Sequence, residues 1–516
     1  MSIFSQVATG RPGSNVFNLS HEKKITCDMS TLVPVYLEEI VPGDRFRVNS
    51  EIMLRMAPTL APIMHRVNVS THFFFVPNRI VWDNWQDFIT GGEDGQYSGL
   101  IPRIPINDAT KTKFGKKSLA DYFGIPAIDT SVVLTENYDI NALPFRGYAE
   151  IFNEYYRDQN LQEKIAVDKG DTLDNAQAHA ITNLLTRNWE KDYFTSGFPW
   201  AQKGNPVNAP IDIGYSNPAW LGDEGDNTGA QWTQDTIGNT TDGAITANGP
   251  GGGLARMVRN IDEEATGIDV NELRKAIRLQ EWLEKNARAG SRYVESIMAH
   301  FAERVPDYTA QRPIYLGGGK QPVTISEVLS TYSGEAANTH DLPQGNMSGH
   351  GISVGKTNRF NAKFTEHGFV FGIMSIMPRT AYQQGFERFW NKLDKFDFYW
   401  PEFAQLGEQE VENSEVYYDP LQENVENRET FSYQARYAEY KYKQSQVAGD
   451  FRDNLAFWHM GRIFSNRPSL NEEFIQADPR KDIFAVNDPD TNNLYVQIYH
   501  NVKAIRKMPY HNVPTL

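Results

Sequence analysis

The segment 434–443, QARYAEYKYK, interleaves cations with tyrosines. Cations neutralise phosphates, and aromatic rings stack on unpaired bases without demanding a particular sequence, so this pattern suits a nonspecific surface for single-stranded nucleic acid. The alternative is an ordinary strand whose Tyr and Lys side chains form cross-strand pairs. The candidate nucleic-acid-binding residues are Arg436, Tyr437, Tyr440, Lys441 and Lys443.

Two further basic stretches lie elsewhere in the chain. Lys503, Arg506 and Lys507 are close to the C-terminus, and KTKFGKK occupies residues 111–117. We interpret KTKFGKK as a solvated loop.

Motifs for catalysis and for phosphate or metal binding are incomplete. GGGK at 317–320 is followed by Gln321 and Pro322, which removes the Ser or Thr and the helix start of a P-loop, so we predict a turn there. The 11 histidines include no HExxH pair, and GDEGDN at 222–227 lacks the ligand spacing of an EF-hand. The one cysteine, Cys27, excludes an intramolecular disulfide framework and a cysteine-built metal site. We therefore predict no catalytic site, no metal and no cofactor, although carboxylate pairs that meet only in three dimensions stay open.

Composition favours a loop-rich β protein. The 516 residues are 40% hydrophobic and 12% aromatic, with 39 glycines and 27 prolines, a balance typical of many short strands joined by turns. A formal charge of −15 argues against a surface that coats duplex nucleic acid uniformly, but it leaves room for local basic patches. The sequence has no visible secretory signal and no run of 18 apolar residues, so we expect a soluble chain without membrane insertion.

The elements that must position these residues begin with two strands. In 45–55 hydrophobic residues alternate with Arg, Asn and Glu, which predicts a half-buried strand. In 67–76 both faces become apolar, so this strand must be covered on both sides. Trp82, Trp85 and Phe88 then recur at three-residue spacing, which predicts one short helix with its rings on one side.

Further along the chain, helix and strand patterns alternate with excursions. We predict helices at 147–161 and 269–301, the second bent by Gly290, and we interpret the polar tract 201–260 as a surface excursion. The remaining segments are an N-terminal arm at 1–30, a buried strand at 368–378, an aromatic cluster at 386–400, and a final strand and arm at 496–510. Strands at both ends of the chain suggest a sheet closed by distant segments, as in a jelly roll or a related β-sandwich.

Several segments together resemble the major capsid proteins of the Microviridae, most closely those of the gokushovirus branch of single-stranded DNA phages. The resemblance is carried by VFNLSHEKKITCDMSTLVPVYLEEIVPGDRF (16–46), THFFFVPNRIVWDNWQDF (71–88), NELRKAIRLQEWLEKNARAGSRYVESIMAHF (271–301), RYAEYKYKQSQVAGDFRDNLAFWHMGRIF (436–464) and the tail AIRKMPYHNVPTL.

This resemblance implies a single domain over 1–516, a viral eight-stranded antiparallel jelly roll with long helical and loop insertions and with N- and C-terminal arms. It implies a structural, non-enzymatic protein of the virion that assembles in the host cytoplasm into a T=1 icosahedral shell around a circular single-stranded DNA genome. The tract 201–265 is our candidate for the surface insertion that forms threefold protrusions in this branch. The implied partners are other copies of the chain, the packaged DNA, small DNA-binding and internal scaffolding or pilot proteins, and a host surface receptor.

The competing class is a β-sandwich enzyme or lectin that acts on carbohydrate. Exposed aromatic residues and scattered acids are its only support in the sequence, and a sugar-binding assay would separate the two classes.

Overall fold

The structure is a computed structural model that describes residues 13–205, 207, 270–290, 292–329, 347–486, 488 and 490–511. The chain divides into two compact units, one made of Met1–Ala201 with Ala289–Leu516 and the other of Gln202–Arg288. Almost all of the predicted excursion at 201–260, and with it the acidic segment 222–227, lies outside the described residues.

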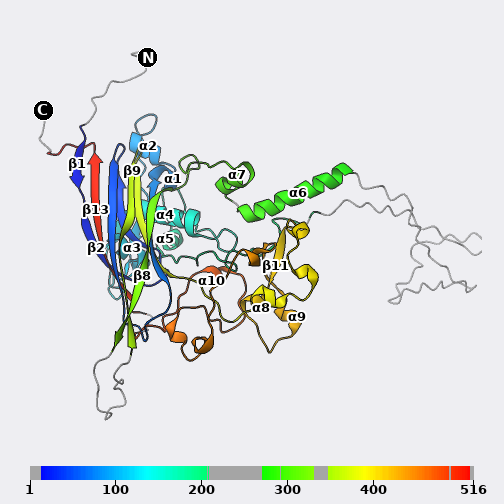
Figure 1. Cartoon of the computed structure of the whole chain (residues 1–516). Coiled ribbons are helices and arrows are strands. Elements are labelled where there is room, and N and C mark those ends of the chain that lie inside the picture. The colour runs from blue at the N-terminus through cyan, green and yellow to red at the C-terminus, as the bar shows by residue number, and fades with distance from the viewer. Residues whose placement is uncertain are drawn as a thin grey trace, which may run out of the picture. The chain divides into compact units, whose positions relative to one another are not determined.

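One antiparallel sheet organises the first unit (Figure 1). Its strands run in the order β1-β13-β4-β9-β8-β5-β10-β3, and β2 also pairs with β13. Their bounds are β1 Asn15–Asn18, β2 His21–Cys27, β3 Val33–Ile40, β4 Arg45–Met56, β5 Val67–Pro77, β8 Ile314–Leu329, β9 Met347–Lys363, β10 Gly368–Pro378 and β13 Leu494–Arg506. Two small sheets pair β6 (Arg103–Ile106) with β7 (Tyr138–Asn141) and β11 (Glu408–Glu412) with β12 (Thr430–Ala435).

The described part of the predicted N-terminal arm, from residue 13 onward, pairs with a strand of the same chain. β1 pairs with residues 503–506 of β13, and β2 pairs with residues 494–500 of the same strand. The two short strands therefore share one position in the sheet, which gives it eight strand positions. The predicted closure of the sheet by the two ends of the chain is confirmed, and so is the jelly-roll-like β-sandwich.

The sheet folds over itself because β8 and β9 each serve two neighbours. β8 pairs with β5 through residues 314–323 and with β9 through 324–329. The two halves enclose a hydrophobic core in which side chains of β4 and β13 meet those of β5 and β10. This core includes Phe46, Val48, Ile52, Leu54, Val67, Val69, Phe73, Phe75, Val370, Met374, Ile376, Val496, Ile498 and Val502.

β5 is buried on both faces, as its sequence predicts. Phe73 and Phe75 face the core inside the sandwich, while Phe74 and Val76 pack against helices on the other side. The helices of this unit include α1 (Asn78–Val81), α2 (Trp85–Thr90), α3 (Leu119–Phe123), α4 (Leu143–Ile151), α5 (Asn175–Ile181), α7 (Tyr293–Phe301), α8 (Asn413–Val416), α9 (Asn424–Asn427) and α10 (Glu472–Ile475). α3, α4 and α5 lie beside the sheet (Figure 1), where α3 contacts β3 and α4 contacts β10.

Three sequence predictions need correction. The aromatic helix at 82–88 is split, because Trp82 is extended (φ −149°) between α1 and α2, although its ring still packs 5.0 Å from that of Phe88. The helix predicted over 269–301 is interrupted at Gly290, whose φ of +98° separates α6 (Val270–Ala289) from α7. The helix at 147–161 instead begins at Leu143 in α4 and ends in one π-helical stretch, Phe152–Tyr156.

The predicted turn at 317–320 is wrong, since these residues lie inside β8. A register shift opposite Phe73 and Phe74 marks a β-bulge here. A Cβ on Gly318 would lie 2.2 Å from the backbone oxygen of Thr71, so glycine permits a close approach of two strands. Glycine in this tract serves strand packing rather than chain reversal.

Candidate nucleic-acid interface

The segment 434–443 leaves its strand almost at once. β12 ends at Ala435, Tyr437 has a left-handed backbone (φ +62°), and residues 438–440 form a 3-10 turn. The alternative of a continuous strand with cross-strand Tyr and Lys pairs is therefore wrong beyond Ala435. The positive φ at Tyr437 ends the ladder by turning the backbone out of the sheet.

Tyr437 is buried, and its polar groups are occupied within the chain. Its hydroxyl donates to the Phe398 carbonyl at 3.3 Å and accepts from the Trp400 amide at 3.2 Å. The Arg436 guanidinium lies over the Tyr437 ring, 5.0 Å from the centroid. Both side chains therefore support the local fold.

The other three candidates are more accessible, and of the two lysines Lys441 has no ion-pair partner among the described residues. Lys443 forms an ion pair with Glu387 and lies 5.5 Å from the Phe389 ring centroid. The exposed Tyr440 ring is covered on one side by the ammonium of Lys392, 4.0 Å from its centroid. Contacts within the chain thus already occupy the Lys443 ammonium and one face of the Tyr440 ring, which the sequence pattern had suggested for nucleic acid.

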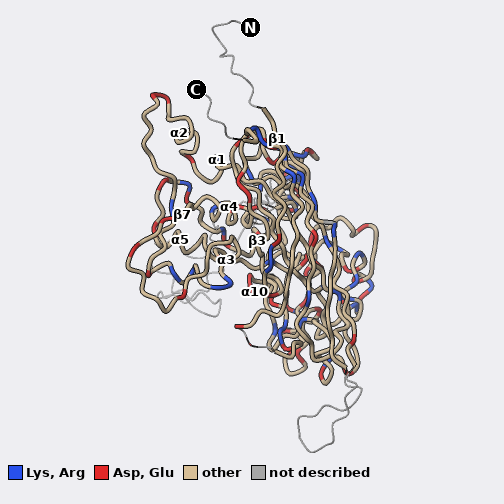
Figure 2. Tube along the Cα trace, turned by 90° about the vertical axis from the view of Figure 1, so that its left-hand side faces the viewer, with Lys and Arg blue, Asp and Glu red and all other residues tan. Residues whose placement is uncertain are grey.

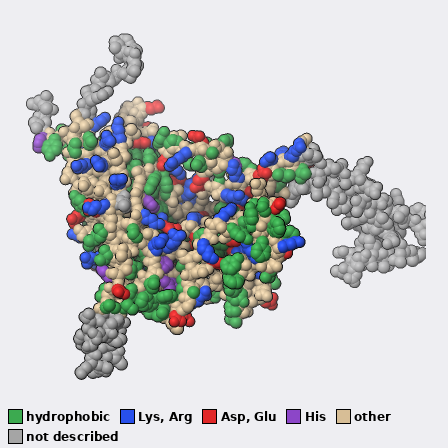
Figure 3. Space-filling model, viewed as in Figure 1, with side chains coloured by type: hydrophobic (Ala, Val, Ile, Leu, Met, Phe, Trp, Pro, Cys, Tyr) green, Lys and Arg blue, Asp and Glu red, His purple; other side chains and the backbone are tan. Residues whose placement is uncertain are grey.

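The structure brings this segment against the predicted aromatic cluster at 386–400. The rings of Tyr399 and Tyr437 lie 4.9 Å apart. Around this contact large aromatic side chains face solvent, and Figure 3 shows hydrophobic side chains gathered over β11 and α8. We call this set the aromatic patch: Phe389, Trp390, Phe396, Phe398, Tyr399, Trp400 and Tyr440.

A buried ion pair lies beneath the aromatic patch. Arg388 contacts the Glu415 carboxylate at 2.8 Å, and the Tyr193 hydroxyl donates to the same carboxylate at 3.0 Å. Burial raises the pKa of Glu415 to about 7, while Arg388 opposes this shift. This ion pair therefore connects the segment that carries Phe389 and Trp390 to α8.

The other basic stretches differ from one another. Arg506 pairs with Glu38 at 3.0 Å and with Asp44 at 3.3 Å, whereas Lys503 faces solvent from β13. In KTKFGKK, residues 111–114 form a 3-10 turn with Phe114 buried, so the interpretation as a simple solvated loop is wrong for its middle. Phe114 packs in the core formed by the helices and β5.

Groups suited to catalysis have structural duties. Burial raises the pKa of the Cys27 thiol, which disfavours the thiolate nucleophile. His72 bonds with the Tyr156 hydroxyl at 2.8 Å, as expected of a structural histidine, and burial lowers its pKa to about 4. Within the described ranges no group of three or more His, Cys, Asp or Glu is placed to hold a metal ion, and no helix is long and apolar enough to cross a membrane.

The sequence GISVG, 351–355, has the spacing of a nucleophile elbow. It lies inside β9 rather than on a strand-to-helix turn. The hydroxyl of Ser353 is buried, donates to the Pro322 carbonyl at 2.7 Å and accepts from Gln321 Nε2 at 2.9 Å. This serine therefore packs in the sandwich and is not presented to a substrate.

Sequence reasoning missed a second surface. The outward faces of β4, β9 and β13 place cations from three distant segments side by side. The signal was present in the alternation of β4, which predicted that Arg45, Arg47 and Arg55 share one face, but the register with β9 and β13 was not visible in the sequence.

A jelly-roll-like sandwich with an uncovered aromatic patch has the features of a subunit that assembles with other copies. Comparison with known proteins agrees. The family described as "Capsid protein (F protein)" matches residues 5–516, and the chain belongs to this family of phage capsid proteins.

Individual relatives are similar over almost the whole chain. Capsid protein VP1 of Chlamydia phage 1 is 37% identical over 596 residues, which cover 99% of this chain and 97% of that protein. Capsid protein VP1 of Bdellovibrio phage phiMH2K is 36% identical, with 99% and 97% covered, and that of Spiroplasma virus 4 is 29% identical, with 97% and 94% covered. The resemblance to gokushovirus-type Microviridae capsid proteins is confirmed.

Proposed function

We propose that this phage capsid protein self-assembles into a closed T=1 icosahedral shell that encloses a circular single-stranded DNA genome. The observation that carries the assembly is the aromatic patch, because large rings clustered on a surface mark a contact with another protein. In a shell each contact is repeated by every copy, so modest interfaces stabilise the whole. The T=1 geometry and the DNA cargo rest on the family resemblance.

Negative-stain electron microscopy tests the proposal. The purified chain is expressed with and without the small proteins encoded beside it, which on this proposal include DNA-binding and scaffolding or pilot proteins acting in the host cytoplasm. Uniform closed particles that contain nuclease-protected single-stranded DNA are the expected result. A chain that stays monomeric under both conditions contradicts the proposal.

Within this function, Arg436, Tyr437, Tyr440, Lys441 and Lys443 remain our candidate contacts to the packaged DNA. Their supporting feature is accessibility at two positions, the cation Lys441 and the ring of Tyr440. Lys441→Ala with Lys443→Ala should lower the DNA content and the salt sensitivity of particles. Unchanged values for both would leave the segment with a structural role only.

The tract 201–265 remains our candidate for the threefold protrusion and for host attachment. Deleting 217–253 should leave a folded chain that still forms shells with altered threefold features. The insertion assignment fails if this deletion prevents the monomer from folding.

A further inference from the structure

The outward face of three neighbouring strands concentrates positive charge. In the sheet register Arg45 of β4 lies opposite Lys363 of β9, and Arg47 of β4 lies opposite Lys503 of β13. Arg359 of β9 follows one step along, opposite Asn49. We call this set the basic sheet face: Arg45, Arg47, Arg359, Lys363 and Lys503, all exposed.

Among the described residues none of these five cations forms an ion pair, although the same face holds an ion pair of Lys356 with Glu51 at 2.9 Å. Like charges directly opposite each other on a sheet destabilise it. The pairs Arg45 with Lys363 and Arg47 with Lys503 therefore carry a free-energy cost that a bound anion would relieve.

The charge is local and opposite in sign to the rest of the chain. The whole protein carries −15, yet Figure 2 shows Lys and Arg gathered near β1, and Figure 3 shows them spread over the surface that the sheet forms. An acidic protein with one basic face concentrates its attraction for polyanions at that face.

Flat rings and apolar side chains continue the same face toward its other end. Tyr499 and Tyr495 alternate with buried residues along β13, and Met53 and Val354 lie beside them on β4 and β9. Rings and cations on one continuous surface are the combination that binds unpaired bases and their phosphates together.

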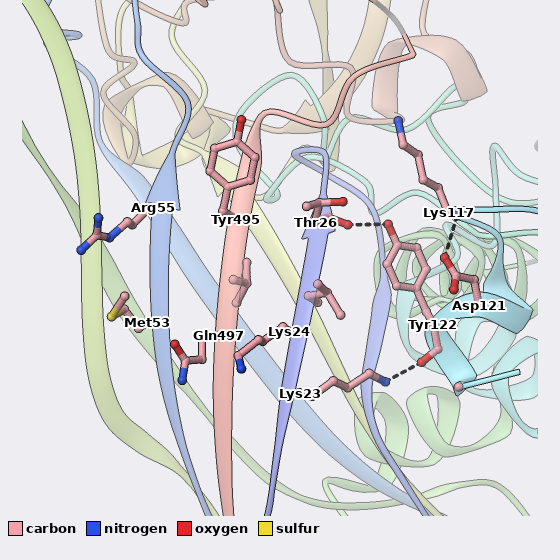
Figure 4. A pocket seen from close by; sticks show the side chains of 13 residues that line it. Lys23, Lys24, Thr26, Met53, Arg55, Lys117, Asp121, Tyr122, Tyr495 and Gln497 are labelled. Carbon is pink, nitrogen blue, oxygen red and sulfur yellow. Dashed lines mark hydrogen bonds between the residues drawn. The ribbon is translucent and has the colours of Figure 1, made fainter. Parts of the chain in front are cut away.

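This end of the face opens into a groove. Figure 4 shows Arg55 and Tyr495 on one side and Tyr122 with Lys117 on the other, with Lys24 of β2 between them. The groove has a volume of about 720 Å³. The groove extends the surface that carries the basic sheet face from β4 across β13 to β2 and α3.

The face is rigid because its reverse side is core. Phe46, Val48 and Val502 alternate with the cations and are buried in the sandwich. His500 is fixed there by bonds to Ser50 Oγ at 2.7 Å and to the Val35 carbonyl at 3.1 Å. Ordering the backbone on binding therefore costs little.

We propose that the basic sheet face is the surface on which this capsid protein binds single-stranded DNA, and that it forms the inner wall of the shell. This inference rests on the proposed function, since it assumes that single-stranded DNA is the cargo. The occupant is DNA rather than a small basic partner protein, because a basic partner would be repelled. An acidic surface of a second copy is the competing occupant, and the experiment separates the two.

The test is fluorescence anisotropy of the purified full-length chain with a labelled 30-nucleotide oligo(dT), measured over a series of salt concentrations. Neutralising a cation that contacts a single strand lowers the slope of log K against log salt by about 0.7. Arg47→Gln with Lys503→Gln should therefore lower the slope by about 1.4 and the affinity at 0.1 M salt by roughly 25-fold. The matched control, Lys441→Gln with Lys443→Gln, removes the same charge from the segment 434–443 beside the aromatic patch. Because Lys443 is already paired with Glu387, this control should lower the slope by no more than the one contact of Lys441, about 0.7.

A charge-keeping variant separates charge from packing. Arg47→Lys with Lys503→Arg should bind as the wild type does, and a loss equal to that of the Gln variant would overturn the proposal. If the Gln variant does not unfold cooperatively, Arg359→Gln with Lys363→Gln on β9 takes its place with the same expected loss. The proposal is contradicted if Arg47→Gln with Lys503→Gln and Arg359→Gln with Lys363→Gln both keep the wild-type slope. It is also contradicted if the wild-type chain does not bind the oligonucleotide.

Assembly provides the second readout. The Gln variant should still form shells, with less packaged DNA per particle. If its shells fail to close while the free chain binds oligo(dT) as tightly as the wild type, the face is a contact between copies and the proposal is wrong. Failure of the wild type to form any particle strikes the proposed function instead, because oligonucleotide binding is measured on the free chain.

Discussion

The aromatic patch and the basic sheet face combine cations with rings in opposite ways. In the patch the cations lie next to the rings in sequence and are consumed locally, Lys443 by Glu387 and Lys392 by Glu439 and the Tyr440 ring. On the sheet face the cations come from β4, β9 and β13, and none of them is paired within the part of the chain that the structure describes. Proximity in sequence therefore favoured internal contacts, whereas the register of a sheet produced an open charged surface.

The difference separates two kinds of partner. An exposed cluster of rings whose charges are already paired suits another protein, because a desolvated contact there leaves no charge uncompensated. An unpaired array of cations suits a polyanion. The four predictions below test this division, from the largest expected effect to the smallest.

The largest effect should come from charging the aromatic patch. Trp390 is 68% exposed, and Trp390→Glu should abolish closed particles while leaving a folded chain, because interface energy concentrates in a few large aromatic side chains. Val354, 69% exposed on the sheet face, supplies the matched control, and Val354→Glu should still form shells. Sedimentation and electron microscopy measure both. Equal loss of assembly in the two variants would contradict the assignment of protein contacts to the aromatic patch and of a polyanion to the basic sheet face.

A second comparison concerns the ion pairs that belong to each surface. Glu415→Ala leaves Arg388 and the Tyr193 hydroxyl without their partner, and breaking a buried pair costs about 3–5 kcal/mol of the free energy of unfolding. Glu51→Ala breaks the exposed pair with Lys356 on the sheet face and should cost less than about 1 kcal/mol. Urea unfolding at pH 8, where Glu415 is mostly ionised, measures both. Similar losses would mean that the pair of Arg388 with Glu415 does not hold the aromatic patch in place.

The two regions should also respond to pH with opposite signs. Burial lowers the pKa of His500 to about 3, so the unfolded chain takes up a proton below pH 6.5 that the folded chain refuses. Stability from His500 is therefore complete above 6.5 and falls by about 2 kcal/mol by pH 5. The raised pKa of Glu415 acts in the other direction, since the folded chain binds its proton first as the pH falls from 7 toward 4.5.

Melting at pH 7 and pH 5 checks this prediction. His500→Gln should reduce the loss of stability between the two pH values, and Glu415→Gln should increase it. A change of the same sign in both variants would show that one of the two side chains does not titrate as its surroundings require.

The sheet was largely predictable from the sequence because its signals are local. Alternation gave the buried and exposed residues of β4, and continuous hydrophobicity gave the two-sided burial of β5. The prediction for GGGK was wrong because a glycine-rich segment is typical of a turn. Only the neighbouring backbone at Thr71 shows that glycine is needed for close strand packing.

The candidate site was less predictable, since its chemistry depends on distant partners. Nothing near Lys443 in the sequence indicates that Glu387 pairs with it, and nothing near Arg47 places Lys503 opposite. Cations and rings that are close in sequence can contact one another or the side chains packed around them, so their charges become paired within the chain. A cluster made by strand register appears only when the fold is known.

The smallest effect should come from single rings. Tyr499 is 39% exposed beside the basic sheet face, and Tyr440 is 55% exposed in the aromatic patch with Lys392 against its ring. Base stacking on an accessible ring contributes about 1–3 kcal/mol, so Tyr499→Ala should weaken oligo(dT) binding by about 1 kcal/mol, the lower end, because part of the ring lies against the sheet. Tyr499→Phe should bind as the wild type does, since stacking needs the ring and not the hydroxyl.

Tyr440→Ala is the informative control because it removes the more exposed ring. Exposure alone predicts the larger loss at Tyr440, whereas the division between the surfaces predicts the larger loss at Tyr499. Anisotropy at a single low salt concentration distinguishes these outcomes. A greater loss at Tyr440 would return the DNA contact to the segment 434–443 and would leave the cations of the sheet to another anionic partner.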